Sequence, residues 1–295
     1  MTGFREIADR VYVMRYPVLD VNVTLVTSPG AALVVDTLST AAQAGELADA
    51  IRGITRDPLI IVNTHHHFDH CFGNATLAGA GVPIWAHEDA VRELRERAGS
   101  LPQDLYERWL PSEPELAAGL AEVTVRVPDR LVGARATVDV AGRAVALHHL
   151  GRGHTGGDLV VHVPDAGVTL AGDLVEQGAP PSYGDDSYPL EWPDTVAAML
   201  RLVPPDGIVV PGHGAPVDRA FVRAQHEQLG ELERLIREGH ADGAGVLDVA
   251  ARSPFGAEAS LTAVRRGYAS VPGRWPGFRP CDMGAGPVAG AAPVR

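Results

Sequence analysis

The sequence contains no lysine. All 25 of its basic residues are arginine, and 37 acidic residues bring the formal net charge to −12. Without lysine, the chain cannot form a Schiff base with a substrate or bring a P-loop lysine to a phosphate. An acidic chain without a dense arginine cluster also repels nucleic acid. We therefore expect neither lysine-based chemistry nor a nucleic-acid partner.

Cysteine is almost as scarce. Cys71 and Cys281 are too few for a disulfide framework or a cysteine-rich zinc site. No apolar run approaches the length that spans a bilayer. Residues 1–10 carry four charges and no apolar stretch, unlike a secretory signal. We therefore expect a cytoplasmic protein with no membrane partner.

The remaining composition is typical of a globular enzyme. The 295 residues are 45% apolar and 21% charged, which is sufficient for a hydrophobic core. The apolar periodicity changes repeatedly between that of strands and that of helices, and no linker-like stretch divides the middle of the chain. We therefore predict one domain at 1–271 and a loose tail, rich in Pro, Gly and Ala, at 272–295.

Runs of strands are followed by helices twice, which predicts a mixed α/β fold of two sheets packed face to face with helices outside. The last long helix is expected to turn Phe221, Ala224, Leu232 and Leu235 inward and to end at Gly239. Strands are predicted at residues 10–16, 21–27, 31–36, 58–63, 82–86, 123–127, 136–140, 144–147, 159–163, 168–171 and 208–210. Helices are predicted at 40–53, 88–97, 196–203, 217–238 and 257–269, with a partly helical insertion or flap at 100–120.

Four potential metal ligands lie in one short motif at the end of the all-apolar strand at 58–63. The motif reads His65-x-His67-x-Asp69-His70. Imidazole and carboxylate groups suit zinc, iron or manganese. Alternate residues of such a loop can face one metal while the last two turn toward a second position. The motif therefore offers ligands to two adjacent metals.

Three further candidates, His154, Asp173 and His213, each follow a predicted strand and each lie near glycine. Glycine lets the backbone turn sharply and approach closely, so that the side chain can face a shared cleft. Ligands dispersed in this way fit an open catalytic site. A structural zinc site is more often compact and rich in cysteine.

In motif order and spacing, these residues resemble the metallo-β-lactamase superfamily over roughly residues 10–230. The resemblance implies a four-layer αβ/βα sandwich with two divalent metal ions at one edge, Zn²⁺ before Fe or Mn. It also implies a role for each residue: His65, His67 and His154 bind the first metal, Asp69, His70 and His213 bind the second, Asp173 bridges both, and Asp36 orients the metal loop.

The resemblance further implies hydrolysis by a hydroxide held between the metals. Asp69 would orient it and carry a proton to the leaving group. We expect an ester, thioester or lactone bond of a small molecule to be cleaved, because Asp173 as the bridging residue is similar to glyoxalase II. Family members that act on β-lactams often have Cys at that position and use Lys on the drug. This chain has neither feature, so the sequence disfavours β-lactamase activity.

Three alternatives stay open at this point. Some superfamily members keep these motifs and are mononuclear non-haem iron persulfide dioxygenases, and others are phosphodiesterases. A metal-dependent binding protein without catalysis is disfavoured because Asp69 is intact. Metal content separates the first alternative from a hydrolase. The sequence leaves open the natural substrate, the native metal and whether the chain forms a homodimer.

Residues around the motifs have simpler expected roles. His66 is expected to face away from the metals, and Cys71 to be a packing residue. Aromatic residues of the loop that includes Tyr183 and Trp192 either line a substrate pocket or pack the loop. Arg152 either contacts an anionic substrate or is solvated. The roles of Cys71, Arg152 and this loop stay open.

Overall fold

The computed structural model describes residues 3–79 and 81–271. The predicted tail at 272–295, with Cys281, lies outside these described residues. Within the described ranges, no helix combines the length and the apolar character needed to cross a membrane.

Most of the predicted strands are present, with ends shifted by a few residues, because alternating valine-rich segments fit a pleated and half-buried surface. The strands are β1 (Arg5–Ala8), β2 (Val11–Tyr16), β3 (Val21–Ser28), β4 (Ala31–Val35), β5 (Leu59–Val62), β6 (Ile84–His87), β7 (Arg130–Val132), β8 (Arg135–Val140), β9 (Arg143–His148), β10 (Val160–Val163), β11 (Val168–Glu176), β12 (Ile208–His213) and β13 (Val217–Asp218).

The predicted helices also form. The first begins where predicted, since the Thr40 side chain accepts a hydrogen bond from the backbone N–H of Gln43. The helices are α1 (Ala41–Arg52), α2 (Phe68–Cys71), α3 (Asn74–Leu77), α4 (Glu88–Arg97), α5 (Leu101–Trp109), α6 (Pro114–Ala121), α7 (Trp192–Leu200), α8 (Arg219–Asp242), α9 (Val246–Ala250) and α10 (Ala257–Ser270), with 3-10 turns η1 (Val18–Asp20) and η2 (Pro164–Ala166).

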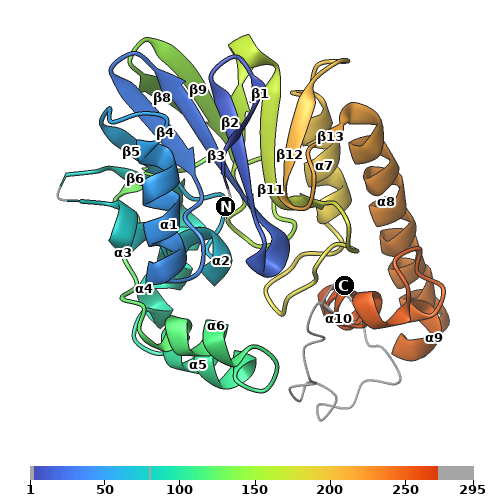
Figure 1. The fold of residues 1–295 in the computed structure, drawn as a ribbon. Helices are drawn as coiled ribbons and strands as arrows, with labels where there is room; N and C mark the ends of the chain where they lie inside the picture. Colours follow the sequence, from blue (N-terminus) through green and yellow to red (C-terminus); the bar gives the residue numbers. More distant parts are fainter. Residues whose placement is uncertain (1–2, 80, 272–295) are drawn as a thin grey trace.

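The strands form one hydrogen-bonded sheet that folds over into two facing halves (Figure 1). The first half runs β7-β6-β5-β4-β3, with β2 and β1 beside β3, and the second runs β12-β11-β10-β9-β8, with β13 beside β12. The halves meet where β3 pairs with β12, and in the described chain this pairing aligns Val21 with His213. We expected two separate sheets; the β3–β12 pairing joins them along this seam.

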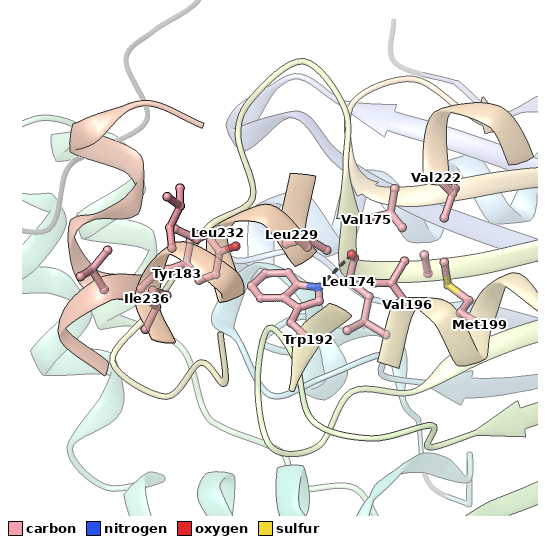
Figure 2. Packing of buried hydrophobic residues seen from close by; sticks show 14 of the residues in the cluster. Leu174, Val175, Tyr183, Trp192, Val196, Met199, Val222, Leu229, Leu232 and Ile236 are labelled. Atoms are coloured by element: carbon pink, nitrogen blue, oxygen red, sulfur yellow. Dashed lines mark hydrogen bonds between the residues drawn. The ribbon is translucent and has the colours of Figure 1, made fainter. Parts of the chain in front are cut away.

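Three hydrophobic clusters define the layers. Leu33 of β4 packs between the two halves with Val161 of β10, whereas its neighbour Val34 faces Leu47 of α1. On the other side, α7, α8, α9 and α10 cover the second half. Figure 2 shows this outer cluster, in which Trp192 of α7 packs with Leu229 of α8. The order helix, sheet, sheet, helix confirms the predicted sandwich.

The predicted strand at 123–127 is wrong. Its three valines are partly buried against the cluster that α5 and α6 make with Cys71 and Phe72. The place beside β6 is taken by β7, so the backbone of 123–127 has no strand partner. The alternation of valines here reflects packing against helices. The predicted insertion at 100–120 forms α5 and α6.

The end predicted for the last long helix is also wrong. The helix starts at Arg219 after the Asp218 cap and runs through Gly239 to Asp242, where Gly243 adopts a left-handed backbone with φ of 70°. Gly239 is buried where α9 and α10 pack against α8. A Cβ at this position would lie 2.4 Å from Cγ2 of Val249, so this glycine serves packing and not termination.

The buried face of α8 is confirmed at Leu232 and Leu235 and differs from the prediction in the first turns of the helix. Phe221 and Ala224 are exposed, and Val222, Gln225 and Leu229 are buried instead. The helix begins at the Asp218 cap, whose carboxylate accepts from the backbone N–H of Phe221 at 2.8 Å. This start turns Phe221 toward solvent.

Candidate metal centre

The histidine motif lies on a loop, residues 63–70, that follows β5 and includes the first turn of α2. Asp36 directly follows β4 and has a left-handed backbone (φ of 67°). Its side chain binds the start of this histidine loop. Its Oδ1 accepts from the backbone N–H of Thr64, and its Oδ2 accepts from Thr64 Oγ1, both at 2.8 Å. The buried carboxylate therefore fixes the start of the histidine loop, at the place that the resemblance implied.

The first group of candidate ligands is His65, His67, His154 and Asp173, whose ligand atoms all lie within 4.8 Å of one another. His67 Nδ1 is 2.8 Å from His154 Nε2. Asp173 Oδ2 is 3.3 Å from His154 Nε2 and 3.7 Å from His65 Nε2. The histidine loop after β5 thus meets the loop between β9 and β10, which carries His154, and strand β11, which carries Asp173.

The second group is Asp69, His70 and His213, again within 4.8 Å of one another. His213 Nε2 lies 3.4 Å from His70 Nε2 and 3.5 Å from Asp69 Oδ2. Asp173 reaches this group too, with Oδ1 3.1 Å from His70 Nε2 and Oδ2 3.2 Å from His213 Nε2. The structure therefore brings all seven predicted residues together, with Asp173 between the two groups.

Asp173 lies within β11 and not after a strand as predicted. Gly172, with φ of 52°, breaks the register between β11 and β12. A Cβ at Gly172 would lie 2.9 Å from Cβ of Thr64. The glycine therefore permits both the bulge and the close approach of β11 to the histidine loop.

Each candidate histidine has one ring nitrogen engaged away from the cluster, which sets the direction of the other nitrogen. These partners are Thr64 Oγ1 for His65 Nδ1 (3.1 Å), Asp186 Oδ2 for His67 Nε2 (2.9 Å), Asp36 Oδ2 for His70 Nδ1 (2.8 Å), the Ser182 carbonyl for His154 Nδ1 (3.0 Å) and the Leu19 carbonyl for His213 Nδ1 (2.7 Å).

This bonding pattern fits a bound cation. His70 and His213 both donate from Nδ1, so neutral rings turn two lone pairs toward each other, and His67 faces His154 in the same way. A positive charge must lie between such pairs, either a proton or a metal ion. Among the described residues, buried His65 Nε2 also has no hydrogen-bond partner, as expected of a metal-binding atom.

The carboxylates also place protons on this cluster when no cation is bound. Burial lowers the pKa of His213, but Asp173 and its neighbours raise it to about 10. The pKa of His70 is raised well above its usual range against the same burial, first by Asp173. Binding of a metal ion must displace these protons, so it is expected to weaken as the pH falls.

Asp186 was not among the predicted site residues. It lies on the loop between β11 and α7, and its Oδ2 contacts His66 Nε2 at 3.1 Å as well as His67 Nε2. With His66 and His67 it makes a third group that could hold a cation. His66 thus points to Asp186, outside the two main groups. The sequence gave no signal of this contact, because Asp186 lies 119 positions from His67.

The aromatic residues of this loop mainly pack. Tyr183 and Trp192 are buried with ring centroids 4.9 Å apart, and Trp192 Nε1 donates to the carbonyl of Leu174 at 3.1 Å (Figure 2). Arg152 is paired with Glu191 through two hydrogen bonds. Its guanidinium also lies 4.2 Å from the ring centre of Tyr188.

Comparison with known proteins places these features in a family context. The family model described as the metallo-β-lactamase superfamily matches residues 16–213. The metallo-β-lactamase type 2 of Bacillus cereus is 27% identical over 165 residues, which are 55% of this chain and 54% of that protein. The chain thus spans about half the length of the curated relatives it matches.

Solved structures show the same fold. A metallo-β-lactamase from Pontibacter korlensis has a TM-score of 0.63 at 20% identity, with 78% of this chain and 99% of that chain covered. The mono-zinc form of the metallo-β-lactamase FIM-1 from Pseudomonas aeruginosa has a TM-score of 0.61 at 19% identity, with 79% and 96% covered.

Proposed function

The chain belongs to the metallo-β-lactamase superfamily, and from this premise we propose that it is a dinuclear metal-dependent hydrolase. Its substrate would be a small molecule with an ester, thioester or lactone bond. The observation that carries the proposal is the position of Asp173, which lies within 3.7 Å of histidine nitrogens from both groups. A carboxylate shared in this way suits two adjacent ions.

The donor set supports the choice of metal. Imidazole and carboxylate ligands without thiolate suit Zn²⁺, and also Mn²⁺ or Fe²⁺. In this assignment His65, His67 and His154 hold one ion, and Asp69, His70 and His213 hold the other. When bound, two such ions lower the pKa of a water molecule and polarise a carbonyl oxygen.

Asp69 is the residue that would move protons. Its Oδ2 lies 3.5 Å from His213 Nε2 and 3.8 Å from His70 Nε2, and its carboxylate is slightly exposed, unlike the ring of His70. It can accept a proton from the attacking water and pass it to the departing oxygen or sulfur.

The charges near the site favour a substrate without strong negative charge. Arg152, the basic residue beside His154, is already engaged by Glu191. The chain contains no lysine. A polyanion would therefore find little compensation here, and a neutral ester, thioester or lactone is the better match.

A second candidate function rests on the surroundings of one oxygen of Asp173. His65 and His154 both approach the same oxygen of Asp173, and two histidines with one carboxylate are the ligand set of mononuclear iron oxygenases. This arrangement would suit an iron persulfide dioxygenase.

Metal content tests the two candidates against each other. The protein is purified without added metal and analysed for elements. About two zinc or manganese ions per chain, with hydrolysis of a lactone, thioester or ester, is the expected result. A phosphodiester and a β-lactam serve as comparison substrates. About one iron per chain, with oxygen uptake on a persulfide, would overturn the hydrolase.

A further inference from the structure

Asp186 holds the outer nitrogen of one candidate ligand. Its Oδ2 lies 2.9 Å from Nε2 of His67, and that nitrogen must carry the hydrogen, because a carboxylate only accepts. Nδ1 of His67 is then the free nitrogen, and it faces His154 at 2.8 Å. His66 bonds the same carboxylate oxygen at 3.1 Å and so restrains it from a second side.

The loop that contains Asp186 includes a turn that is held by its own hydrogen bonds. Ser187 is fully buried, and its backbone N–H and its Oγ both bond the carbonyl of Gly184, at 3.1 and 2.8 Å. This turn of residues 184–187 places the carboxylate of Asp186 over the histidine loop. Asp185, the neighbouring acid, is exposed.

A residue from the C-terminal helix fixes this turn. Arg266 of α10 donates from Nε to the carbonyl of Ser187 at 2.5 Å and from Nη1 to the carbonyl of Asp185. These two carbonyls belong to the residues on either side of Asp186. Helix α10 lies beyond the 16–213 segment that the family model matches. Figure 1 shows the loop between β11 and α7 and helix α10 at the same end of the molecule.

We propose that Asp186 is a positioning residue that holds His67 with Nδ1 toward the first metal, and that Arg266 extends this support to helix α10. The inference rests on the proposed dinuclear function. Carboxylates that bond the far nitrogen of a metal-binding histidine fix the ring's orientation and raise its basicity. Here the carboxylate comes from a loop that is itself anchored by a helix outside the matched segment.

The test compares metal affinity in the full chain. Asp186→Ala and Asp186→Asn are measured beside Asp185→Ala, which changes an exposed acid of the same turn. Arg266→Met is measured beside Arg265→Met, which changes the exposed arginine next to it. Each protein is titrated with Zn²⁺ against a chromophoric chelator, and the visible spectrum of its Co²⁺ form is recorded. The melting temperature of the metal-free protein reports on folding.

We expect Asp186→Ala to weaken one of the two zinc equivalents about 10- to 100-fold and to change the cobalt spectrum. Asp186→Asn keeps an acceptor oxygen and should lose less. Arg266→Met should shift affinity in the same direction by a smaller factor. The two control variants should match the wild type, and all metal-free proteins should melt as the wild type does.

Three results would overturn the inference or part of it. Wild-type affinity and spectrum in Asp186→Ala would remove the role of Asp186. Wild-type affinity in Arg266→Met alone would remove the role of α10. A wild type that binds no metal would overturn this inference and the proposed function together. If Asp186→Ala weakens zinc but the wild type hydrolyses no tested substrate, the positioning role stands and the proposed function fails.

Discussion

Asp69 and Asp173 are carboxylates of one cluster, yet their surroundings differ. Asp173 lies within 3.7 Å of four histidine nitrogens. Asp69 approaches two of those rings, at 3.5 and 3.8 Å. A group surrounded by ligands serves chiefly to bind, whereas one at the edge is free to exchange a proton. Substitutions at the two positions should therefore have different effects on binding and turnover.

Asp69→Asn should keep at least one metal ion and lose most of the activity. The amide retains an oxygen of similar placement but cannot take up a proton at neutral pH. We expect kcat to fall about 10²- to 10⁴-fold. Steady-state kinetics and metal analysis of the same preparation measure this. Near-normal turnover would remove the proton-transfer role of Asp69.

Asp173→Ala should lose both metal and turnover. Removal of the shared carboxylate leaves His70 and His213 without the negative charge between them, and each ion loses a ligand. Metal analysis after gel filtration should show fewer ions per chain than in the wild type. A variant that retains two ions and normal kcat would contradict the bridging assignment.

His87 should make the protein less stable in mild acid. It ends β6, its Nδ1 accepts from the backbone N–H of Asp89 at 3.2 Å, and its ring stacks on His149 at 3.8 Å. Burial and the neighbouring His149 lower the pKa of His87 to about 4. The unfolded chain, with a pKa near 6.5, therefore binds more protons between about pH 6.5 and 4. The free energy of unfolding should fall as the pH falls through this window.

Urea unfolding at pH 7 and pH 5, in excess chelator to remove metal linkage, measures this effect. His87 should account for roughly 1 kcal/mol of the loss after allowance for solvent screening. His87→Asn keeps a capping acceptor and should lose less stability between the two pH values than the wild type. An identical loss in both proteins would contradict the assignment.

At the scale of elements, sequence patterns predicted the strands and helix starts that depend on neighbouring residues. The valine alternation of β3 and β4 and the Thr40 cap of α1 were confirmed, because strand pleating and capping depend on neighbours in sequence. The failures at 123–127 and at Gly239 share a different cause. There the valines or the glycine pack against α5 and α6 or against α9 and α10, and the sequence pattern does not predict where those helices lie in the fold.

The candidate site likewise has residues that the sequence predicted and residues that it did not. Four of the seven predicted residues share one short motif and the other three lie next to or near glycine, and the structure brings all seven to one cluster. Asp186 follows no motif, since a hydrogen bond over 119 positions is set by how the loop after β11 folds. Arg266 is still further from any sequence signal, because it acts through two backbone carbonyls.

Gly239 and Gly230 offer a matched pair on α8. A Cβ at Gly239 would lie 2.4 Å from Val249 and 2.6 Å from the Tyr268 hydroxyl, whereas one at Gly230 meets nothing within 4 Å. Gly239→Ala should lower the free energy of unfolding by about 1–3 kcal/mol through overpacking. Gly230→Ala should raise it by up to about 1 kcal/mol, because alanine favours helix. Chemical denaturation measures both free energies of unfolding. A Gly239→Ala variant that is more stable than the wild type would show that α9 and α10 shift to make room for the added methyl group.

At the scale of the whole molecule, the two sheet halves each supply part of the site. The histidine loop belongs to the first half, and His154, Asp173 and His213 come with the second. Bound ions would therefore cross-link the halves. Metal should stabilise the fold by about 4 kcal/mol when free metal exceeds its dissociation constant a thousandfold.

Chelation should accordingly lower the melting temperature by roughly 10 °C, since a chain of this size shifts about 2–4 °C per kcal/mol. Thermal scans with saturating Zn²⁺ and with excess chelator measure the difference. Asp173→Ala serves as the control, because its melting temperature should respond little to chelator. Equal melting of the wild type in both conditions would show that the ions do not hold the halves together.

The candidate ligands are synthesised at different times, because His213, which pairs with Val21 where the two sheet halves meet, comes late in the chain. The histidine loop is synthesised about 140 residues before His213. At about 5–20 residues per second, this separation is a delay of roughly 7–30 s. Throughout that delay the nascent chain lacks His213, one of the three members of the second group. Binding of both proposed metal ions would therefore require that His213 has been made, and the nascent chain passes through a stage in which the set of candidate ligands is incomplete.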